Sequence, residues 1–192
     1  NEKCNLRCIY CMPEEGVKLL NKDQYLSKLE IKRIISLFTQ MGISKIRFTG
    51  GEPLLREDIP ELIRYAKNEC KIDQVHLTTN GILLNKYLDQ LSKAGLSGIN
   101  ISLDSLKPER FKKITRRDKL QQVLDNILLA QDSTIPSLKI NVVFMRDFND
   151  DELLDFVEFT KTNHITVRFI ELMPFDAHQI WKTGKFYKSE DI

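Results

Sequence analysis

The sequence predicts an α/β protein that forms a partial (β/α)6 barrel, with the first strand and the C-terminal region of the barrel outside this chain. Short apolar strands alternate with amphipathic helices along almost all of its 192 residues. Each strand carries polar side chains at every second position, whereas strands of an open doubly wound sheet are apolar on both faces. No low-complexity stretch or linker divides the chain, so we expect one domain, residues 1–192. Because the chain opens at Asn1, we expect it to be part of a longer protein.

The individual elements follow from helix-start signals and apolar spacing. Ser27-Lys28-Leu29-Glu30 has the form of a capping box, and the helix that it opens should end at Gly42. Asp58 should cap the next helix. The predicted helices are Ser27–Gly42, Asp58–Asn68, Asn85–Ala94, Lys119–Asp132 and Asp151–Thr162, and the predicted strands are Lys45–Phe48, Gln74–Thr78, Gly98–Leu103, Leu138–Met145 and Ile165–Ile170.

Right-handed crossovers would make these strands parallel neighbours and give them a shared polar face. The residues on that face are Lys45, Arg47, His76, Thr78, Asn100, Ser102, Lys139, Asn141 and Arg168. Cations inside a barrel are costly without a counter-charge. The face therefore predicts an anionic small-molecule ligand; the alternative is that single cations reach solvent at a sheet end or pair with Asp or Glu.

Charge and hydropathy exclude two classes of partner. The net charge is only +2, and no Lys/Arg cluster combines with an aromatic platform, so a nucleic-acid partner is not expected. No run of eighteen apolar residues is present, so no membrane-spanning segment is expected.

Three of the four cysteines, Cys4, Cys8 and Cys11, lie within eight residues, which favours metal binding over disulfides. A zinc site would need a fourth ligand, and no further Cys or His lies nearby. Three thiolates on a 4Fe-4S cluster would leave one iron open for a ligand. Thiolate ligands also imply a reducing compartment, such as the cytoplasm, or the mitochondrial matrix in a eukaryote.

Thr49-Gly50-Gly51-Glu52-Pro53 directly follows a predicted strand, where two glycines allow the backbone to approach a ligand. This segment together with the cysteine triplet resembles the radical S-adenosylmethionine superfamily, which uses Gly-Gly-Glu to hold the amine of the cofactor. The chain is most similar to the GTP 3′,8-cyclases of molybdenum cofactor biosynthesis. That resemblance rests on Cys4-Asn-Leu-Arg-Cys-Ile-Tyr-Cys-Met-Pro-Glu-Glu, Ile46-Arg-Phe-Thr-Gly-Gly-Glu-Pro-Leu-Leu-Arg56, Leu77-Thr-Thr-Asn-Gly81, Asn100-Ile-Ser-Leu-Asp-Ser105, Lys139-Ile-Asn-Val-Val-Phe144 and Val167-Arg-Phe-Ile-Glu-Leu-Met-Pro-Phe175.

The resemblance implies roles for named residues. It implies that the three cysteines hold a 4Fe-4S cluster, that GTP binds Arg47, Thr78 and Lys139, and that S-adenosylmethionine contacts Tyr10, Gly50, Gly51, Glu52, Ser102 and Met173. Lys45 and Arg168 join the GTP site on the evidence of the strand face alone.

The resemblance also implies a reaction and partners. One electron enters the cluster from a donor such as flavodoxin or ferredoxin and cleaves S-adenosylmethionine. The resulting radical abstracts hydrogen from C3′ of GTP, and the ribose then closes onto C8 of guanine. A second 4Fe-4S cluster is expected in the full-length protein, a pyranopterin synthase acts downstream, and the family allows a homodimer. The alternatives are a radical enzyme with another substrate, such as a peptide, and a non-catalytic metal- or ligand-binding barrel.

Overall fold

The computed structural model describes residues 2–173, 186–188 and 190. Its centre is a five-stranded parallel sheet in the order β1-β2-β3-β4-β5. The strands are β1 (Lys45–Phe48), β2 (Gln74–Thr79), β3 (Gly98–Ser102), β4 (Leu138–Phe144) and β5 (Thr166–Glu171). Because β1 and β5 do not pair with each other, the described sheet is an open part of a barrel, as the sequence predicts.

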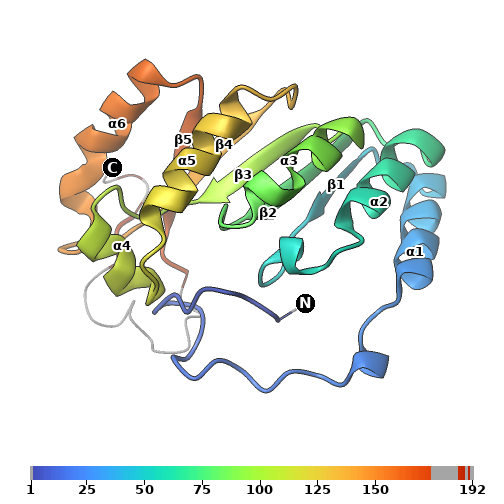
Figure 1. Ribbon diagram of the computed structural model, residues 1–192, viewed down its shortest axis with the longest axis horizontal. Helices are drawn as coiled ribbons and strands as arrows, with labels where there is room; N and C mark the ends of the chain where they lie inside the picture. Colours follow the sequence, from blue (N-terminus) through green and yellow to red (C-terminus); the bar gives the residue numbers. More distant parts are fainter. Residues whose placement is uncertain (1, 174–185, 189, 191–192) are drawn as a thin grey trace.

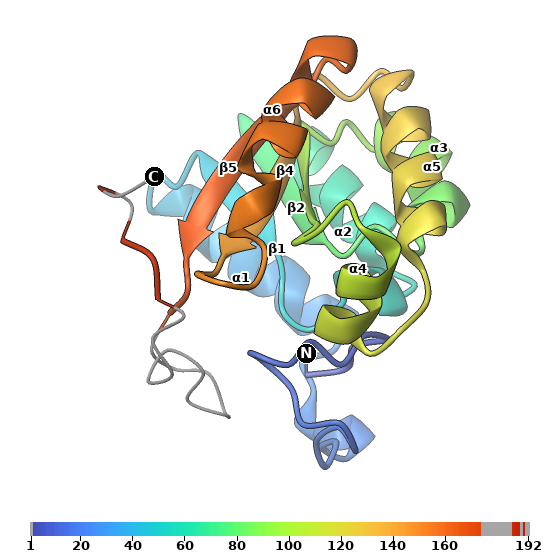
Figure 2. The same cartoon turned by 90° about the vertical axis from the view of Figure 1, so that its left-hand side faces the viewer.

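Helices precede and connect the strands and lie along one face of the curved sheet (Figure 1, Figure 2). They are α1 (Lys28–Gln40), α2 (Ile59–Arg64), α3 (Leu84–Lys93), α4 (Pro108–Thr115), α5 (Leu120–Gln131) and α6 (Leu153–Thr162). The capping box at Ser27 is present, with Glu30 at its third position. The second predicted helix continues past α2 as a π-helical turn, Tyr65–Glu69. Short 3-10 turns lie at Lys22–Gln24, Pro53–Leu55 and Asp150–Glu152.

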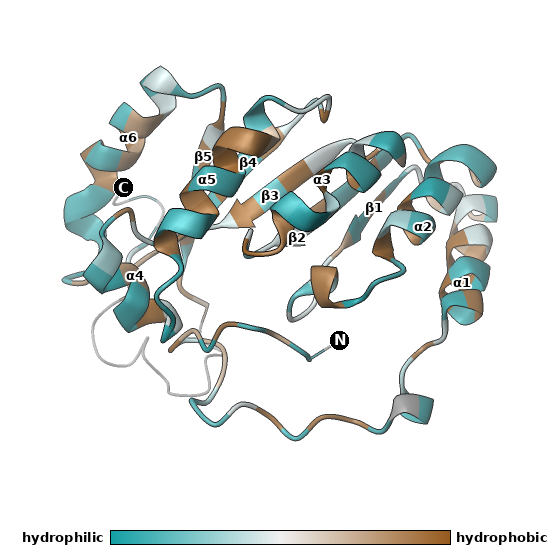
Figure 3. Ribbon diagram, viewed as in Figure 1, coloured by the Kyte–Doolittle hydropathy of each residue, from teal (hydrophilic) through white to brown (hydrophobic). Residues whose placement is uncertain are grey.

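The core fills the space between the sheet and these helices. Alternate strand residues, among them Val75, Leu77, Ile99, Ile101, Ile140 and Val142, are fully or almost fully buried. The helices turn apolar residues toward the same layer (Figure 3). Burial of this layer supplies the main stabilisation of the fold, roughly 25 cal/mol for each Å² of apolar surface. The opposite sheet face carries the polar residues that alternate with these.

Helix α4 is the one α-helix of the described chain that the periodicity misses. Pro108 stands at its first turn, and only Phe111, Ile114 and Thr115 of its residues are buried. A two-turn helix with so few apolar positions gives a weak periodic signal. It lies beside the N-terminal segment (Figure 1, Figure 2) and becomes important for the site.

Within the part of the chain that the structure describes, no helix combines the length and apolar character needed to cross a bilayer.

Candidate functional site

The cysteine loop lies across the carboxyl ends of three strands. The amide of Glu52, after β1, donates to the Lys3 carbonyl at 2.7 Å. Asn80, after β2, donates through its side chain to the Asn5 amide oxygen at 2.6 Å. The Tyr10 hydroxyl donates to Asp104, after β3, at 2.6 Å. Since carboxyl ends of parallel strands form the usual ligand edge of such a sheet, the predicted metal loop lies where a cofactor site is expected.

The three thiols lie on this loop within eight residues of one another. Cys4 and Cys8 are half-buried and Cys11 is exposed. Cys4 Sγ accepts from the Leu6 amide at 3.4 Å and from the Asn80 side chain at 3.9 Å. A hydrogen bond between the Cys8 and Cys11 thiols raises the pKa of Cys8 and lowers that of Cys11, while burial raises the pKa of Cys4.

In number and chemistry the three thiols match the donors that a cubane cluster would take, one thiolate for each of three irons, and the N–H donors to Cys4 Sγ are of the kind that tune such a cluster. Because the loop has no fourth cysteine and no histidine, it would leave the fourth iron of a bound cluster without a protein ligand. Among residues 2–173, 186–188 and 190, no three His, Cys, Asp or Glu side chains converge on a point for a single metal ion.

The Gly-Gly-Glu segment packs against the start of the cysteine loop. A Cβ on Gly51 would lie 2.2 Å from the Lys3 carbonyl oxygen, so only glycine allows the two backbones to come so close. Gly50 has a φ of 144°, which also favours glycine.

The Glu52 side chain is fully buried and turned into the protein. It accepts from the Leu54 amide at 2.9 Å, the Thr79 hydroxyl at 2.8 Å and the Asn80 amide at 2.8 Å. Burial nevertheless raises the pKa of this carboxyl, against the lowering effect of these donors. Glu52 therefore ties the loop after β1 to the end of β2.

The inner strand face brings two of the four predicted cations, Arg47 and Arg168, together. Register pairs Thr78 with Asn100, Asn100 with Lys139, and Asn141 with Arg168. Arg47 donates to the Thr78 hydroxyl at 3.2 Å, and Arg168 donates to the Asn141 amide oxygen at 3.1 and 2.6 Å.

Asn100 lies between the two arginines. Its amide, in the orientation that satisfies both neighbours, accepts from Arg47 and, at 3.1 Å, from Arg168. Burial and then the charge of Arg168 lower the pKa of Arg47. No salt bridge of either arginine is found among the described residues, so the pair shares a neutral amide.

The other predicted residues are distributed around this face. Ser102 ends β3 opposite Asn141 and is half-buried. Lys139 is half-buried on β4, whereas Lys45 is exposed at the start of edge strand β1. Met173 is 65% exposed beyond β5, and Pro174 and Phe175 of the same motif lie outside the described residues.

Sequence reasoning missed Asn80 and Asp104, although both stand in the quoted motifs directly after strands. Asp104 is 5% exposed, accepts from Tyr10 and from the Val143 amide at 2.8 Å, and has a pKa raised to about 6 by burial. An Asn or Asp directly after a predicted strand was the signal available in the sequence.

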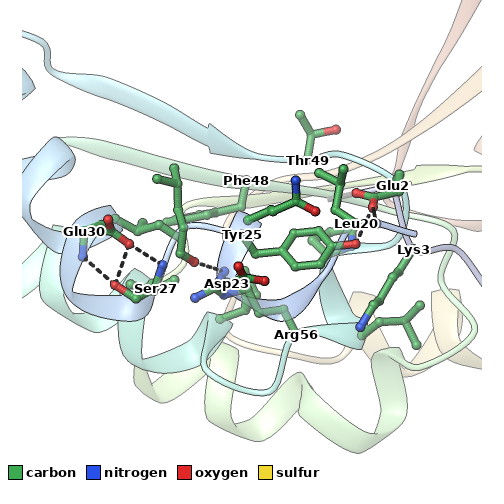
Figure 4. A pocket seen from close by; sticks show the side chains of 17 residues that line it. Glu2, Lys3, Leu20, Asp23, Tyr25, Ser27, Glu30, Phe48, Thr49 and Arg56 are labelled. Atoms are coloured by element: carbon green, nitrogen blue, oxygen red, sulfur yellow. Dashed lines mark hydrogen bonds between the residues drawn. The ribbon is translucent and has the colours of Figure 1, made fainter. Parts of the chain in front are cut away.

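A separate cavity of about 800 Å³ lies between the N-terminal segment, α1 and the loop after β1 (Figure 4). Its lining is largely apolar, and Glu2 accepts there from the Leu20 amide at 2.9 Å and from the Tyr25 hydroxyl. None of the residues expected to bind cluster, cofactor or GTP lines it, so we place the candidate site at the cysteine loop and the inner face.

Comparison with protein families matches residues 1–160 to the model described as the Radical SAM superfamily. The chain belongs to the radical SAM superfamily.

Curated relatives of this radical SAM chain include a protein of Chlorobaculum tepidum named GTP 3′,8-cyclase, 50% identical over 98% of the chain and 56% of that protein. Another is molybdenum cofactor biosynthesis protein 1 of Drosophila melanogaster, 47% identical over 99% of the chain and 33% of that protein. The chain thus spans about half or less of the length of these relatives.

Solved structures share the fold. Streptococcus suis SuiB bound to S-adenosylmethionine matches with a TM-score of 0.71 at 20% identity, over 98% of this chain and 41% of SuiB.

Proposed function

We propose that this chain is the core of a GTP 3′,8-cyclase that acts in molybdenum cofactor biosynthesis. One observation carries the proposal: a three-thiol loop lies at the carboxyl edge of a sheet whose inner face holds Arg47 and Arg168, and neither arginine has an acidic partner among the described residues. A triphosphate would supply the counter-charge that the pair lacks. The similarity to proteins named GTP 3′,8-cyclase supports this choice of substrate.

Cys4, Cys8 and Cys11 would hold a 4Fe-4S cluster through their thiolates. When bound, the cluster and S-adenosylmethionine supply a one-electron cleavage of the sulfonium and hence the means to remove a hydrogen from ribose. Around them, Tyr10, Ser102 and Met173 would contact the cofactor. The position of the Tyr10 hydroxyl is fixed by Asp104.

The loop formed by Gly50, Gly51 and Glu52 would bind the cofactor. Since both carboxylate oxygens of Glu52 already accept hydrogen bonds, its main contribution is to fix the loop, leaving backbone groups of the glycines to face a ligand. A buried carboxylate that accepts from three protein donors is well suited to hold a binding loop in one geometry.

Arg47, Thr78 and Lys139 would bind GTP, with Arg168 on β5 and Lys45 at the rim. Guanidinium groups suit phosphate oxygens because they offer paired N–H donors. Asn100 and Asn141 orient the two arginines through neutral oxygens, so the positive charge stays available. Placement of both substrates next to each other is the protein's own contribution to rate.

A one-electron donor such as flavodoxin or ferredoxin, a second 4Fe-4S cluster in the full-length protein, a homodimer and a downstream pyranopterin synthase belong to the same proposal, as does a cytoplasmic or mitochondrial-matrix location.

The test is to incubate the reduced, reconstituted full-length protein with S-adenosylmethionine and GTP, ATP or a peptide panel, and to measure 5′-deoxyadenosine. Stimulation by GTP alone is expected. Arg47→Ala should weaken GTP binding about ten-fold or more, whereas Arg33→Ala, an exposed arginine on α1, should leave it unchanged. Stimulation by peptides but not GTP, or Arg47→Ala binding GTP normally, would contradict the proposal.

A further inference from the structure

Arg116, at the C-terminal end of α4, has a backbone conformation that a non-glycine residue rarely adopts. Its φ is 56° and its ψ is 26°, in the left-handed region. Such a conformation costs free energy and persists only where the surroundings hold it, often next to a functional site.

The Arg116 guanidinium spans the cysteine loop. Its Nη1 donates to the Arg7 carbonyl at 2.9 Å and to the Met12 carbonyl at 3.2 Å. Arg7 precedes Cys8, and Met12 follows Cys11. One donor therefore joins the two sides of the segment that carries the second and third thiols. The side chain is only 23% exposed, so water competes weakly for these carbonyls.

The end of α4 holds the same loop through its backbone. The Arg7 amide donates to the Thr115 carbonyl at 3.0 Å, and the Ile9 amide donates to the Ile114 carbonyl at 2.9 Å. Terminal helix carbonyls lack partners in their own helix, and here the loop provides them. Because Ile114 and Thr115 are buried, this end of α4 is a rigid base for Arg116.

We propose that Arg116 is a positioning residue for the cysteine loop, whose strained backbone directs its guanidinium to the two carbonyls that set the spacing of the thiols. Arg7 assists from within the loop, since its Nη1 donates to the Cys4 and Leu6 carbonyls at 2.7 and 2.8 Å. The expected effect on cluster retention rests on the proposed function, whereas the expected effect on the reactivity of the thiols does not.

The decisive variant is Arg116→Gly in the full-length protein. Glycine accepts the left-handed backbone without strain, which offsets the stability lost with the two hydrogen bonds, so the melting temperature should stay close to that of the parent. Loss of two hydrogen bonds should open the loop, so iodoacetamide should modify Cys8 in the reduced, metal-free protein about ten-fold faster. After anaerobic reconstitution, a chelator should remove iron faster by a similar factor of about ten. Arg116→Lys keeps the charge and should restore part of the protection.

Arg117→Ala is the matched control, because Arg117 is exposed and its side chain donates only to the neighbouring Arg116 carbonyl, at 2.8 Å, among the hydrogen bonds described. It should resemble the parent in both assays. Parent-like alkylation of Arg116→Gly would overturn the proposal, as would a fall in its melting temperature that accounts for faster alkylation. A parent protein that takes up no iron would refute the cluster, while alkylation would still report on Arg116.

Discussion

The Gly-Gly-Glu loop and the inner strand face treat their charged side chains in opposite ways: Glu52 is buried, whereas Arg47 is exposed and Arg168 is half-buried. The Glu52 carboxylate is fully buried and accepts from three protein donors. Arg47 and Arg168, by contrast, meet only hydroxyl and amide oxygens in the described structure. A buried carboxylate that accepts from three protein donors fixes the fold, whereas arginines without a counter-charge among the described residues are free to bind an anionic ligand. The comparison predicts that changes at the loop affect stability, whereas changes at the inner face affect ligand affinity.

Glu52→Ala should have the largest effect. It leaves the Leu54 and Asn80 amides and the Thr79 hydroxyl without an acceptor, and each unsatisfied buried group costs about 1–3 kcal/mol. We expect the free energy of unfolding to fall by about 3–5 kcal/mol, measured by chemical denaturation. Glu57→Ala, an exposed neighbour, should stay within about 0.5 kcal/mol of the parent. A parent-like Glu52→Ala would refute the view of Glu52 as a structural link.

Gly51→Ala should come next, because the new methyl would lie 2.2 Å from the Lys3 carbonyl oxygen. The backbone before Cys4 would have to move, at a cost of about 1–3 kcal/mol typical of overpacking. Gly42→Ala is the useful comparison, since its φ is 85° but nothing lies within 4 Å of the added carbon. Its loss should be smaller and arise from backbone strain alone. Equal losses at the two positions would show that the close approach to Lys3 is unimportant.

These two regions also differ in how far sequence could predict them. The polar strand face followed from period-two alternation, because side-chain direction in a strand is fixed by the backbone. This alternation correctly predicted that Arg47, Thr78, Asn100 and Arg168 lie on the same face. The inward direction of Glu52 could not be predicted that way, because a loop residue has no fixed period and its partners come from another strand.

Helix α4 and Arg116 show the same limit. Nothing in the local sequence indicates that Arg116 adopts a left-handed backbone or that its guanidinium reaches a segment about a hundred positions earlier. Such contacts depend on tertiary packing, which overrides local propensity. Sequence therefore predicted most of the helices, the strands and the polar strand face, but not α4 or what holds the cysteine loop in place.

Asn100→Asp should give the two arginines of the inner face an acidic partner from the protein itself. The new carboxylate would lie between Arg47 and Arg168 and supply the counter-charge that Asn100 does not. We expect unchanged or greater stability, together with GTP affinity reduced about ten-fold or more, measured by calorimetry. Asn85→Asp adds the same charge at an exposed position of α3 and should leave affinity unchanged. Unaltered GTP binding in Asn100→Asp would place the triphosphate elsewhere.

The pKa of His76 should show the smallest effect, and it tests the positive charge of the inner strand face locally. Partial burial, and then the charges of Arg47, Lys45, Lys139 and Lys67, lower its pKa below 6.5. The unfolded chain therefore binds more protons than the folded one just below pH 6.5, so this contribution to stability is present above 6.5 and lost as pH falls through the folded pKa. In an NMR titration, Arg47→Gln should raise the His76 pKa toward 6.5, and Lys67→Gln should raise it less. A bound anion would offset the same cations, so saturating GTP should also raise the His76 pKa. If His76 of the parent protein already titrates at 6.5, the inner strand face does not have the cationic character proposed for it.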